Sequence, residues 1–343
     1  MRFVLLVHNN KRVVELFNEN GKELPIPNHS TIAELLYAMA STNPDRLIVW
    51  AHQNCVGILD TAHLNQVFVH KLIMASFSTT KKLFIGNHIG YVEQTPFVNI
   101  SFDVPFPTWQ MSSDVGGIYA EILLPLEKSV KPDTNFSFFL NNIAKSGMAK
   151  GLFCYSNPKL VKSIKNNTEA VRASTFELFR FVKLHYKTKW LFMLWFCMIV
   201  FERRFAVLPL LAAFFSKKVN LQDSVFKSVV PIEKVSEASG IDVIIPTLGR
   251  KKYLLDFLND LSNQTKLPQK IIIIEQNPLM ESHSELNYLR DRTWPFEIDH
   301  TFTHQTGACN ARNIALKKVT AGYVFFADDD LRIAKDFIQT ALN

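Results

Sequence analysis

The sequence contains few cysteines and lacks several features that would place it in a specialised class of protein. The four cysteines, Cys55, Cys154, Cys197 and Cys309, show neither the paired spacing of a zinc site nor a disulfide framework, which predicts reduced thiols and a cytoplasmic location. The apolar run over 3–7 is too short for the hydrophobic region of a signal peptide. No basic segment carries interleaved aromatic residues, so a nucleic-acid partner is not expected.

Long hydrophobic runs are also lacking. Residues 190–201 are wholly apolar, and after Glu202-Arg203-Arg204 a second apolar run covers 205–215. Each run is shorter than the roughly 20 residues that a membrane-spanning helix needs. Two interpretations remain open. We favour a pair of buried helices joining two domains, but the Lys and Arg flanks and the aromatic content also suit interfacial helices on the cytoplasmic face of a membrane.

Positive charge is what the sequence has in excess. Lys and Arg number 38 against 31 Asp and Glu, which gives a formal net charge of +7 and a pI near 9.1. This balance suits phosphate-bearing substrates or anionic lipid headgroups.

The most informative segment lies near the C-terminus, where an apolar run leads directly into three acids. Tyr323-Val324-Phe325-Phe326 predicts a central strand covered on both faces, and Asp328-Asp329-Asp330 follows it. Three adjacent carboxylates repel one another unless a cation lies beside them. A hard divalent ion that also holds a phosphate would supply that charge. The alternative is a solvated acidic turn in which Asp330 caps a helix over 331–342.

Two further strands of the same kind precede this segment. Residues 241–246 and 270–274 are apolar and β-branched, and between them lies a helical pattern with Leu254, Phe257 and Leu258 on one face. Strand, helix and strand at this spacing predict a βαβ unit in a parallel sheet. Ligands of such sheets bind at the carboxyl ends of the strands. A small-residue loop entering a helix, His304 to Asn313, adds backbone N–H groups and a guanidinium suited to a diphosphate, or is simply the cap of an amphipathic helix.

The order of these motifs resembles glycosyltransferase family 2. Ile-Ile-Pro-Thr ends the first strand, an acid ends the second, Gly-x-x-x-Ala-Arg-Asn opens a helix, and Phe-Phe-Ala-Asp-Asp-Asp follows. The resemblance covers roughly 240–343. It implies the nucleotide-sugar-binding half of a GT-A fold, a mostly parallel sheet flanked by helices. The predicted nucleotide-sugar-binding residues are Pro246, Thr247, Arg250, Glu275, Asn277, Arg312 and Asp329, and the predicted metal ligands, for Mn²⁺ or Mg²⁺, are Asp328 and Asp330.

The resemblance implies transfer of a sugar from a nucleotide diphosphate sugar to a hydroxyl of a glycan or lipid-linked acceptor, in cell-surface polysaccharide or glycan synthesis. In the family the catalytic base is an acid from the following half of the domain. No acid after Asp330 suits that role, so the base is unassigned, and we expect a truncated domain that binds the donor without turnover. A non-catalytic nucleotide-sugar-binding or scaffolding protein is the alternative. A nucleotidyltransferase is disfavoured, because no Gly-rich loop with Arg and Lys directly follows the first strand.

The rest of the chain predicts a second α/β domain and an apolar helical connector. We expect domains at 1–165, 166–234 and 235–343, with a linker over 236–240. In the first domain, the strand before His52-Gln53-Asn54 has the same shape as the strand before the acidic triplet. The predicted helix from Asp133 and the strand near 151–155 are similar to the acceptor half of family 2 domains. A degenerate glycosyltransferase-like domain and an unrelated α/β domain both stay open, with Asp114 or Asp133 as the nearest candidates for a base.

Overall fold

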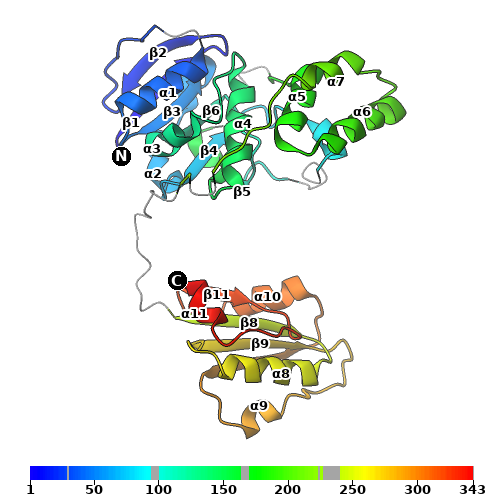
Figure 1. Cartoon of the computed structure of the whole chain (residues 1–343). Coiled ribbons are helices and arrows are strands. Elements are labelled where there is room, and N and C mark those ends of the chain that lie inside the picture. Colours follow the sequence, from blue (N-terminus) through cyan, green and yellow to red (C-terminus); the bar gives the residue numbers. More distant parts are fainter. Residues whose placement is uncertain (29–30, 94–99, 164–169, 223–224, 227–239, 343) are drawn as a thin grey trace. The chain divides into compact units, whose positions relative to one another are not determined.

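The computed structural model divides the chain into two compact units, Met1–Ile232 and Glu233–Asn343 (Figure 1). It describes residues 1–28, 31–93, 100–163, 170–222, 225–226 and 240–342. The predicted linker therefore lies outside the described residues except for Gly240, which directly precedes the first strand of the second unit.

A mixed seven-stranded sheet forms the centre of the first unit, in the order β2-β1-β3-β6-β4-β7-β5. The strands are β1 (Phe3–His8), β2 (Val13–Asn18), β3 (Leu47–His52), β4 (Ile73–Phe77), β5 (Phe106–Pro107), β6 (Val115–Tyr119) and β7 (Phe153–Ser156). β1 runs parallel to β3, and β4 runs parallel to β7. β6 is antiparallel to both β3 and β4. Every residue of β3, β4 and β6 is buried, as expected for strands covered on both faces.

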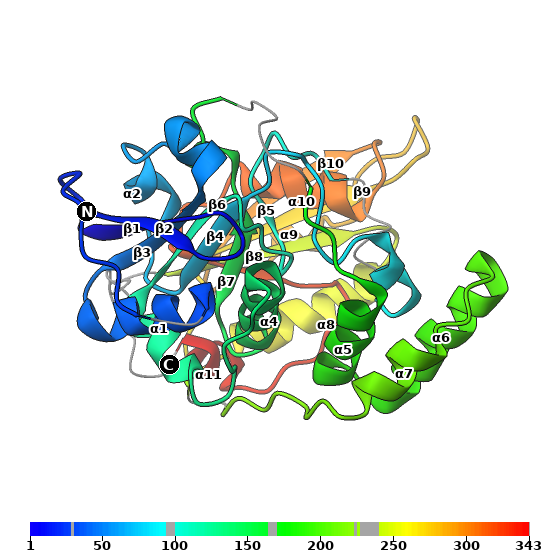
Figure 2. The ribbon, with the colours of Figure 1, turned by 90° about the horizontal axis from the view of Figure 1, so that it is seen from above.

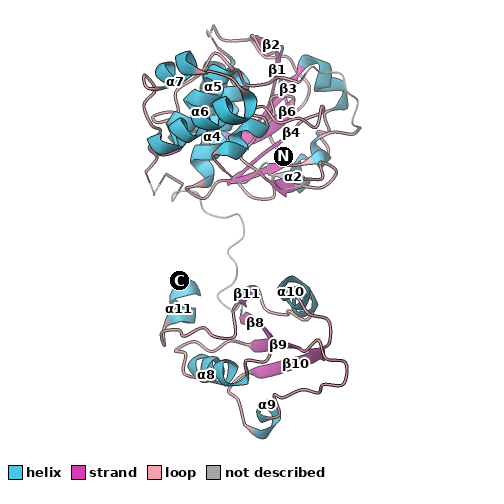
Figure 3. Cartoon of the chain, turned by 90° about the vertical axis from the view of Figure 1, so that its right-hand side faces the viewer, coloured by secondary structure: helices cyan, strands magenta, loops and turns pink. Residues whose placement is uncertain are grey.

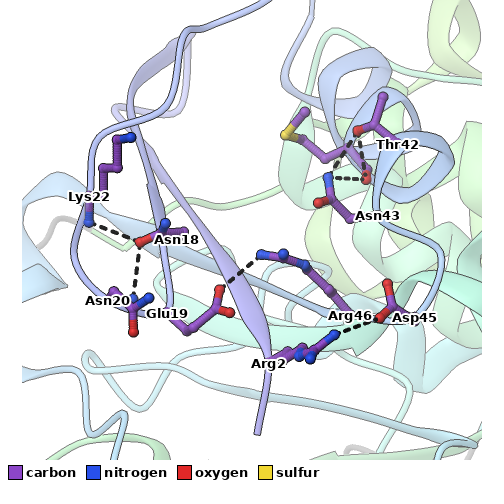
Figure 4. A network of polar contacts seen from close by, with 10 residues as sticks. Arg2, Asn18, Glu19, Asn20, Lys22, Thr42, Asn43, Asp45 and Arg46 are labelled. Carbon is purple, nitrogen blue, oxygen red and sulfur yellow. Dashed lines mark hydrogen bonds and ion pairs between the residues drawn. The ribbon is translucent and has the colours of Figure 1, made fainter.

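Polar contacts join neighbouring segments at the β1–β2 edge of this sheet (Figure 4). Arg46, just before β3, reaches Glu19 at 2.8 Å in the turn after β2, and Arg2 lies 3.7 Å from Asp45. In the same turn the Asn18 side chain accepts two backbone N–H bonds. These pairs are partly or fully exposed, so they order the edge more than they stabilise the unit.

Helices cover the sheet and fill the core of the first unit. They are α1 (Ile32–Thr42), α2 (Leu64–Val67), α3 (Ala120–Leu123) and α4 (Phe136–Met148), with short 3₁₀ turns η1 (Gln53–Ile58), η2 (Asn87–Tyr91), η4 (Leu124–Leu126) and η5 (Pro158–Leu160). α1 begins with a capping box in which Thr31 and Glu34 bond each other's backbone N–H groups. The helix predicted from Asp133 begins at Phe136, because Asn135 caps it.

Three further helices pack together on the first unit (Figure 2): α5 (Thr175–His185), α6 (Thr188–Glu202) and α7 (Val207–Ala213). Leu191, Leu194 and Met198 of α6 join the same hydrophobic cluster as the sheet. In the predicted connector, one face of α6 is therefore buried, and much of the rest of the helix surface is exposed. Within the described part of the chain, no helix combines the length and apolar character needed to cross a membrane.

The second unit is a four-stranded parallel sheet in the order β10-β9-β8-β11. Its strands are β8 (Ile241–Thr247), β9 (Lys270–Gln276), β10 (Glu297–Thr303) and β11 (Tyr323–Phe326), and its helices are α8 (Lys251–Ser262), α9 (Tyr288–Asp291), α10 (Ala308–Leu316) and α11 (Phe337–Leu342). α8 and α10 cover opposite faces of the sheet, each with its own apolar cluster (Figure 3). This arrangement confirms the predicted α/β class and the βαβ unit.

Three expectations for the second unit need correction. β11 is an edge strand of the described sheet with Tyr323 and Phe326 exposed, so the four-residue apolar run does not mark a strand covered on both faces. β10 was not anticipated, since its sequence mixes charged and apolar residues at a sheet edge. The helix expected over 331–342 begins only at Phe337. The segment before it is tied to the end of α8 in a non-helical path. Arg332 forms two bonds with Asp260, at 2.6 and 3.0 Å, and the Gln264 amide donates to the Ala334 carbonyl at 2.7 Å.

Candidate functional site

Two parallel strands of the second unit end side by side. Phe326 of β11 lies opposite Ile244 of β8, and the Ala327 N–H continues the pairing to the Ile244 carbonyl at 3.0 Å. Thr247, the last residue of β8, therefore lies close to the acids that follow β11. Gly249 then turns the chain toward α8 at φ +66°, a conformation that residues with a side chain rarely adopt.

Asp329 is the buried member of the acidic triplet, and it joins the two strand ends. The Thr247 hydroxyl donates to its carboxylate at 2.7 Å, and Arg250 Nη1 lies 3.3 Å from the other oxygen. Arg250 also lies 2.7 Å from Asp330. Asp329 first, and then Asp330, raises the pKa of the Arg250 guanidinium, so Arg250 stays positively charged.

Asp328 and Asp330 face the solvent, with side chains 65% and 49% exposed. Arg312 of α10 donates to Asp328 at 3.0 Å. Two arginines thus place positive charge beside the three adjacent carboxylates. The alternative in which Asp330 caps a helix is wrong, because no helix starts at Leu331.

A pocket of about 340 Å³ opens at this edge of the sheet. It is lined by Pro246, Thr247, Leu248, Arg250, Gln276, Ala308, Asp328, Asp329 and Asp330. The structure thus brings six of the nine predicted site residues around one cavity, and Arg312 reaches it through Asp328. Their part in ligand binding stays a prediction.

Gln276 is a pocket residue that the sequence analysis missed. Its amide donates to the carbonyls of Gln305 and Gly307, at 2.9 and 3.2 Å, and so fixes the loop that leads into α10. Its position at the end of β9, next to the predicted Glu275, was the available signal. The alternation of side chains along a strand sends neighbouring residues to opposite faces, which is why Gln276 and not Glu275 lines the cavity.

Glu275 and Asn277 do not line the pocket. Glu275 is buried and accepts bonds from the Ser284 hydroxyl at 2.5 Å, the Glu285 N–H at 2.9 Å and the His300 ring at 2.9 Å. Asn277 uses its side-chain oxygen to accept the N–H of Leu279. In this structure both residues order the loop after β9, and a contact of Glu275 with a base stays a prediction.

The start of α10 carries hydrogen-bond donors that have no partner in the described part of the chain. Asn310 Nδ2 and Arg312 Nε are both buried and unbonded there. α10 also directs its first backbone N–H groups and the positive end of its dipole toward its N-terminus, where Ala308 lines the pocket. A diphosphate is a suitable acceptor for donors arranged in this way.

The residues present fit a divalent ion in their donor chemistry but do not form a preformed cage. Among the described residues no cluster of three or more His, Cys, Asp or Glu is placed to hold a metal. Mg²⁺, however, is usually bound by one or two carboxylates together with substrate phosphates. The exposed carboxylates of Asp328 and Asp330, on one pocket wall, match that pattern.

The candidate residues of the first unit are held in contacts of their own. Asp114 is buried and accepts the backbone N–H and the hydroxyl of Thr79, each at 2.8 Å. Asp133 pairs with Arg180. His52 is buried, and burial lowers its pKa, which favours a neutral packed ring. A role for either acid as a base stays a prediction.

The second unit is therefore an α/β domain whose pocket lies at the carboxyl edge of a parallel sheet, where open α/β sheets bind their ligands. The sequence of this unit matches a known family. Residues 242–343 match the family described as Glycosyl transferase family 2, which confirms the resemblance that the motif order predicted.

Individual proteins are similar to this chain over 30% of its length. An uncharacterized glycosyltransferase of Haemophilus influenzae (strain ATCC 51907 / DSM 11121 / KW20 / Rd) is 30% identical over 103 residues, which are 30% of this chain and 41% of the relative. This chain thus spans about two fifths of the length of that curated relative.

Solved structures of S. aureus TarS are also similar. The TarS crystal structure is 24% identical over 30% of this chain and 18% of its own, with a TM-score of 0.26. TarS 1-349 in complex with UDP is 23% identical over 30% of each chain, with a TM-score of 0.27.

Proposed function

We propose that this chain is a glycosyltransferase that uses a nucleotide diphosphate sugar, and that its second unit holds the donor. The observation that carries the proposal is the pocket where the ends of β8 and β11 meet α10, with three acids and Arg250 on its wall and Arg312 beside it. The family 2 match over 242–343 supports it.

In the proposed reaction the bond between the anomeric carbon and the diphosphate oxygen breaks, and the electron pair leaves with the diphosphate. The acceptor hydroxyl oxygen forms the new bond and gives its proton to a base. Arg250 and Arg312 are placed to offset charge on the diphosphate, because guanidinium groups bind phosphate oxygens through paired N–H donors. Asp329 orients Arg250 and Thr247 from its buried position.

A divalent Mn²⁺ or Mg²⁺ ion, when bound, would add Lewis-acid stabilisation of the leaving diphosphate. Asp328 and Asp330 are the residues that would hold it. We further propose that the acceptor is a glycan or a lipid-linked sugar, that the reaction serves cell-surface polysaccharide or glycan synthesis, and that the protein acts on the cytoplasmic side.

A second candidate function is a binding or scaffolding protein that holds the donor without transferring it. One observation favours it: each carboxylate of the pocket wall is engaged by an arginine or a threonine, so none is placed as a free base. Both candidates bind the donor, but only the transferase transfers its sugar to an acceptor.

Calorimetry with UDP as the probe, with and without Mn²⁺, tests donor binding. We expect Mn²⁺-dependent binding by the wild type and a loss of about tenfold or more in Asp330→Ala, since one of two charged metal ligands is gone. Asp336→Ala is the matched control, because Asp336 is an exposed acid on the same segment that does not line the pocket. Equal binding by wild type and Asp330→Ala would overturn the metal assignment.

A turnover assay then separates the two candidates. Purified protein is supplied with a panel of nucleotide sugars and a broad acceptor mixture, and released diphosphate is measured. Release that depends on the acceptor supports the transferase. Donor binding without release supports the scaffolding alternative, and no binding to any nucleotide sugar refutes both.

A further inference from the structure

The α6–α7 hairpin, residues 188–213 with the flanking residues to 215, exposes far more apolar surface than a solvated helix pair needs. No charged residue lies between Lys189 and Glu202, yet only Leu191, Leu194 and Met198 of α6 are buried. Large apolar side chains that are more than half exposed occur six times within twenty residues: Phe196, Phe201, Phe205, Leu208, Leu211 and Phe215. Single exposed apolar residues are ordinary, but a group of this kind marks an interaction surface.

The backbone turn between the helices places this surface on one side of the first unit. Arg203 ends α6 in the left-handed region at φ 56°, and its N–H reaches the Ile199 carbonyl at 3.1 Å. The chain then returns along α6, so that the rings of Phe192 and Phe214 lie 6.0 Å apart. Figures 1 and 2 show α6 and α7 beside one another at the periphery of the first unit, away from the β1–β2 edge.

Basic residues surround the apolar surface at both ends. Residues 183–218 contain seven Lys or Arg and a single acid. Lys187 precedes α6 and Lys189 lies in its first turn, while Lys217 and Lys218 follow α7. The ring contact between Phe192 and Phe214 puts these two groups at the same end. Arg203 and Arg204 lie at the opposite end, in the turn.

The single acid of the hairpin offsets only a small part of this charge. Glu202 is turned toward the first unit, where it lies 3.2 Å from the His88 ring and accepts a hydrogen bond from Tyr91, and its other oxygen lies 3.9 Å from Arg204. The hairpin therefore presents apolar side chains bordered by an excess of positive charge. That combination complements the anionic headgroups and acyl boundary of a lipid bilayer. A second copy of the chain would bring like charges together.

The length of the helices decides how such a surface meets a membrane. α6 has 15 residues, so it is roughly 22 Å long, and the hydrocarbon core is about 30 Å thick. A helix of this length lies along the surface and does not span the bilayer.

We propose that the α6–α7 hairpin docks the first unit on an anionic membrane surface, with its apolar face in the headgroup region and its Lys and Arg residues on the lipid phosphates. This surface is on the first unit and is independent of the donor pocket. A failed membrane test therefore leaves the proposed transfer reaction untouched, and the reverse also holds.

Co-sedimentation of the full chain with vesicles tests the proposal. We expect the wild type to bind vesicles of phosphatidylcholine mixed with phosphatidylglycerol, and to bind phosphatidylcholine alone at least about tenfold more weakly, because several basic residues act together. Phe196→Glu combined with Leu208→Glu should lower the partition coefficient at least about tenfold, since two exposed apolar side chains no longer insert.

The matched control combines Val69→Glu with Val104→Glu, two exposed apolar residues of the same unit outside the hairpin. We expect this variant to bind vesicles as the wild type does. Lys187→Gln combined with Lys189→Gln should weaken binding to anionic vesicles about tenfold and reduce its salt sensitivity.

Several results would overturn the proposal. They are a wild type that ignores both kinds of vesicle, a hairpin variant that binds as well as the wild type, and a control that loses as much as the hairpin variant. Loss of the folded circular-dichroism signal in the hairpin variant would show that the face is buried. A lipid-free dimer that the hairpin variant abolishes, seen by light scattering without vesicle binding, would assign the face to a second copy.

Discussion

Replacing Asp242 by alanine should destabilise the second unit, because this buried carboxylate joins β8 to the segment that leads into β11. Asp242 is fully buried, and one of its oxygens accepts the backbone N–H groups of Thr320 and Ala321 at 2.8 and 3.0 Å and the Thr320 hydroxyl at 3.4 Å. Two residues later β11 begins. The loss of these bonds frees the strand whose end carries the acidic triplet.

Two opposing contributions decide how much stability the Asp242→Ala variant loses. A hydrogen bond to a charged group contributes roughly 1.5–3 kcal/mol, so the two short bonds together contribute about 3–6 kcal/mol. Against this, the other carboxylate oxygen of Asp242 has no partner within the described residues, and burying a charge has a desolvation cost. Because the freed N–H groups lie on residues that water can reach, part of the loss is recovered. We expect a net destabilisation of about 2–3 kcal/mol for Asp242→Ala and about 1 kcal/mol for Asp242→Asn.

Hydrogen exchange of the β8 and β11 amides measures this free energy within the second unit, without a contribution from the first. Asp291→Ala is the control, since Asp291 is an exposed acid of the same unit and should change the free energy by less than about 0.5 kcal/mol. UDP binding should weaken more in Asp242→Ala than in Asp242→Asn, because the strand that leads to the acidic triplet is no longer anchored. An Asp242→Ala protein as stable as the wild type would show that desolvation outweighs the hydrogen bonds, and the reasoning would fail.

Two further predictions concern the first unit. Burial lowers the pKa of His8 and of His185 from 6.5 to about 3 each, and the nearby His52 adds to the effect on His8. The folded state therefore favours the neutral rings, and the histidines cost no stability above pH 6.5. As the pH falls from 6.5 toward 3, the free energy of unfolding should decrease by up to about 1.4 kcal/mol per pH unit for each histidine. Thermal unfolding between pH 7 and 4.5 checks this, and a constant melting temperature would contradict it. Gly116→Ala should destabilise by about 1–3 kcal/mol, because a Cβ there would lie 2.3 Å from the buried Trp50 ring and 2.7 Å from a backbone carbonyl. Gly57→Ala, where nothing lies within 4 Å, is the control in urea unfolding, and equal stability of the two variants would refute the packing account.

The sequence by itself determined the local elements and their order in the second unit. β8 and β9 follow from β-branched runs, and α8 follows from the spacing of Leu254, Phe257 and Leu258, because these patterns depend on residues close along the chain. The motif order was also enough to identify the family, which the match over 242–343 confirms. The prediction failed where contacts between distant residues replaced the local pattern. In the segment before α11, Arg332 bonds Asp260 and the Ala334 carbonyl accepts a bond from Gln264, so the helix begins only at Phe337.

Only the tertiary structure decided how the acids of the site differ from one another. Three identical residues in a row carry no signal that Asp329 is buried against Thr247 while its neighbours face solvent, because that depends on a strand some eighty residues earlier in the chain. The same holds for α6, whose sequence is apolar on all sides. The core of the first unit covers one face of that helix and leaves the other exposed, and the reason is physical: burial is a property of which surfaces meet, and a periodic pattern shows only which surfaces are apolar.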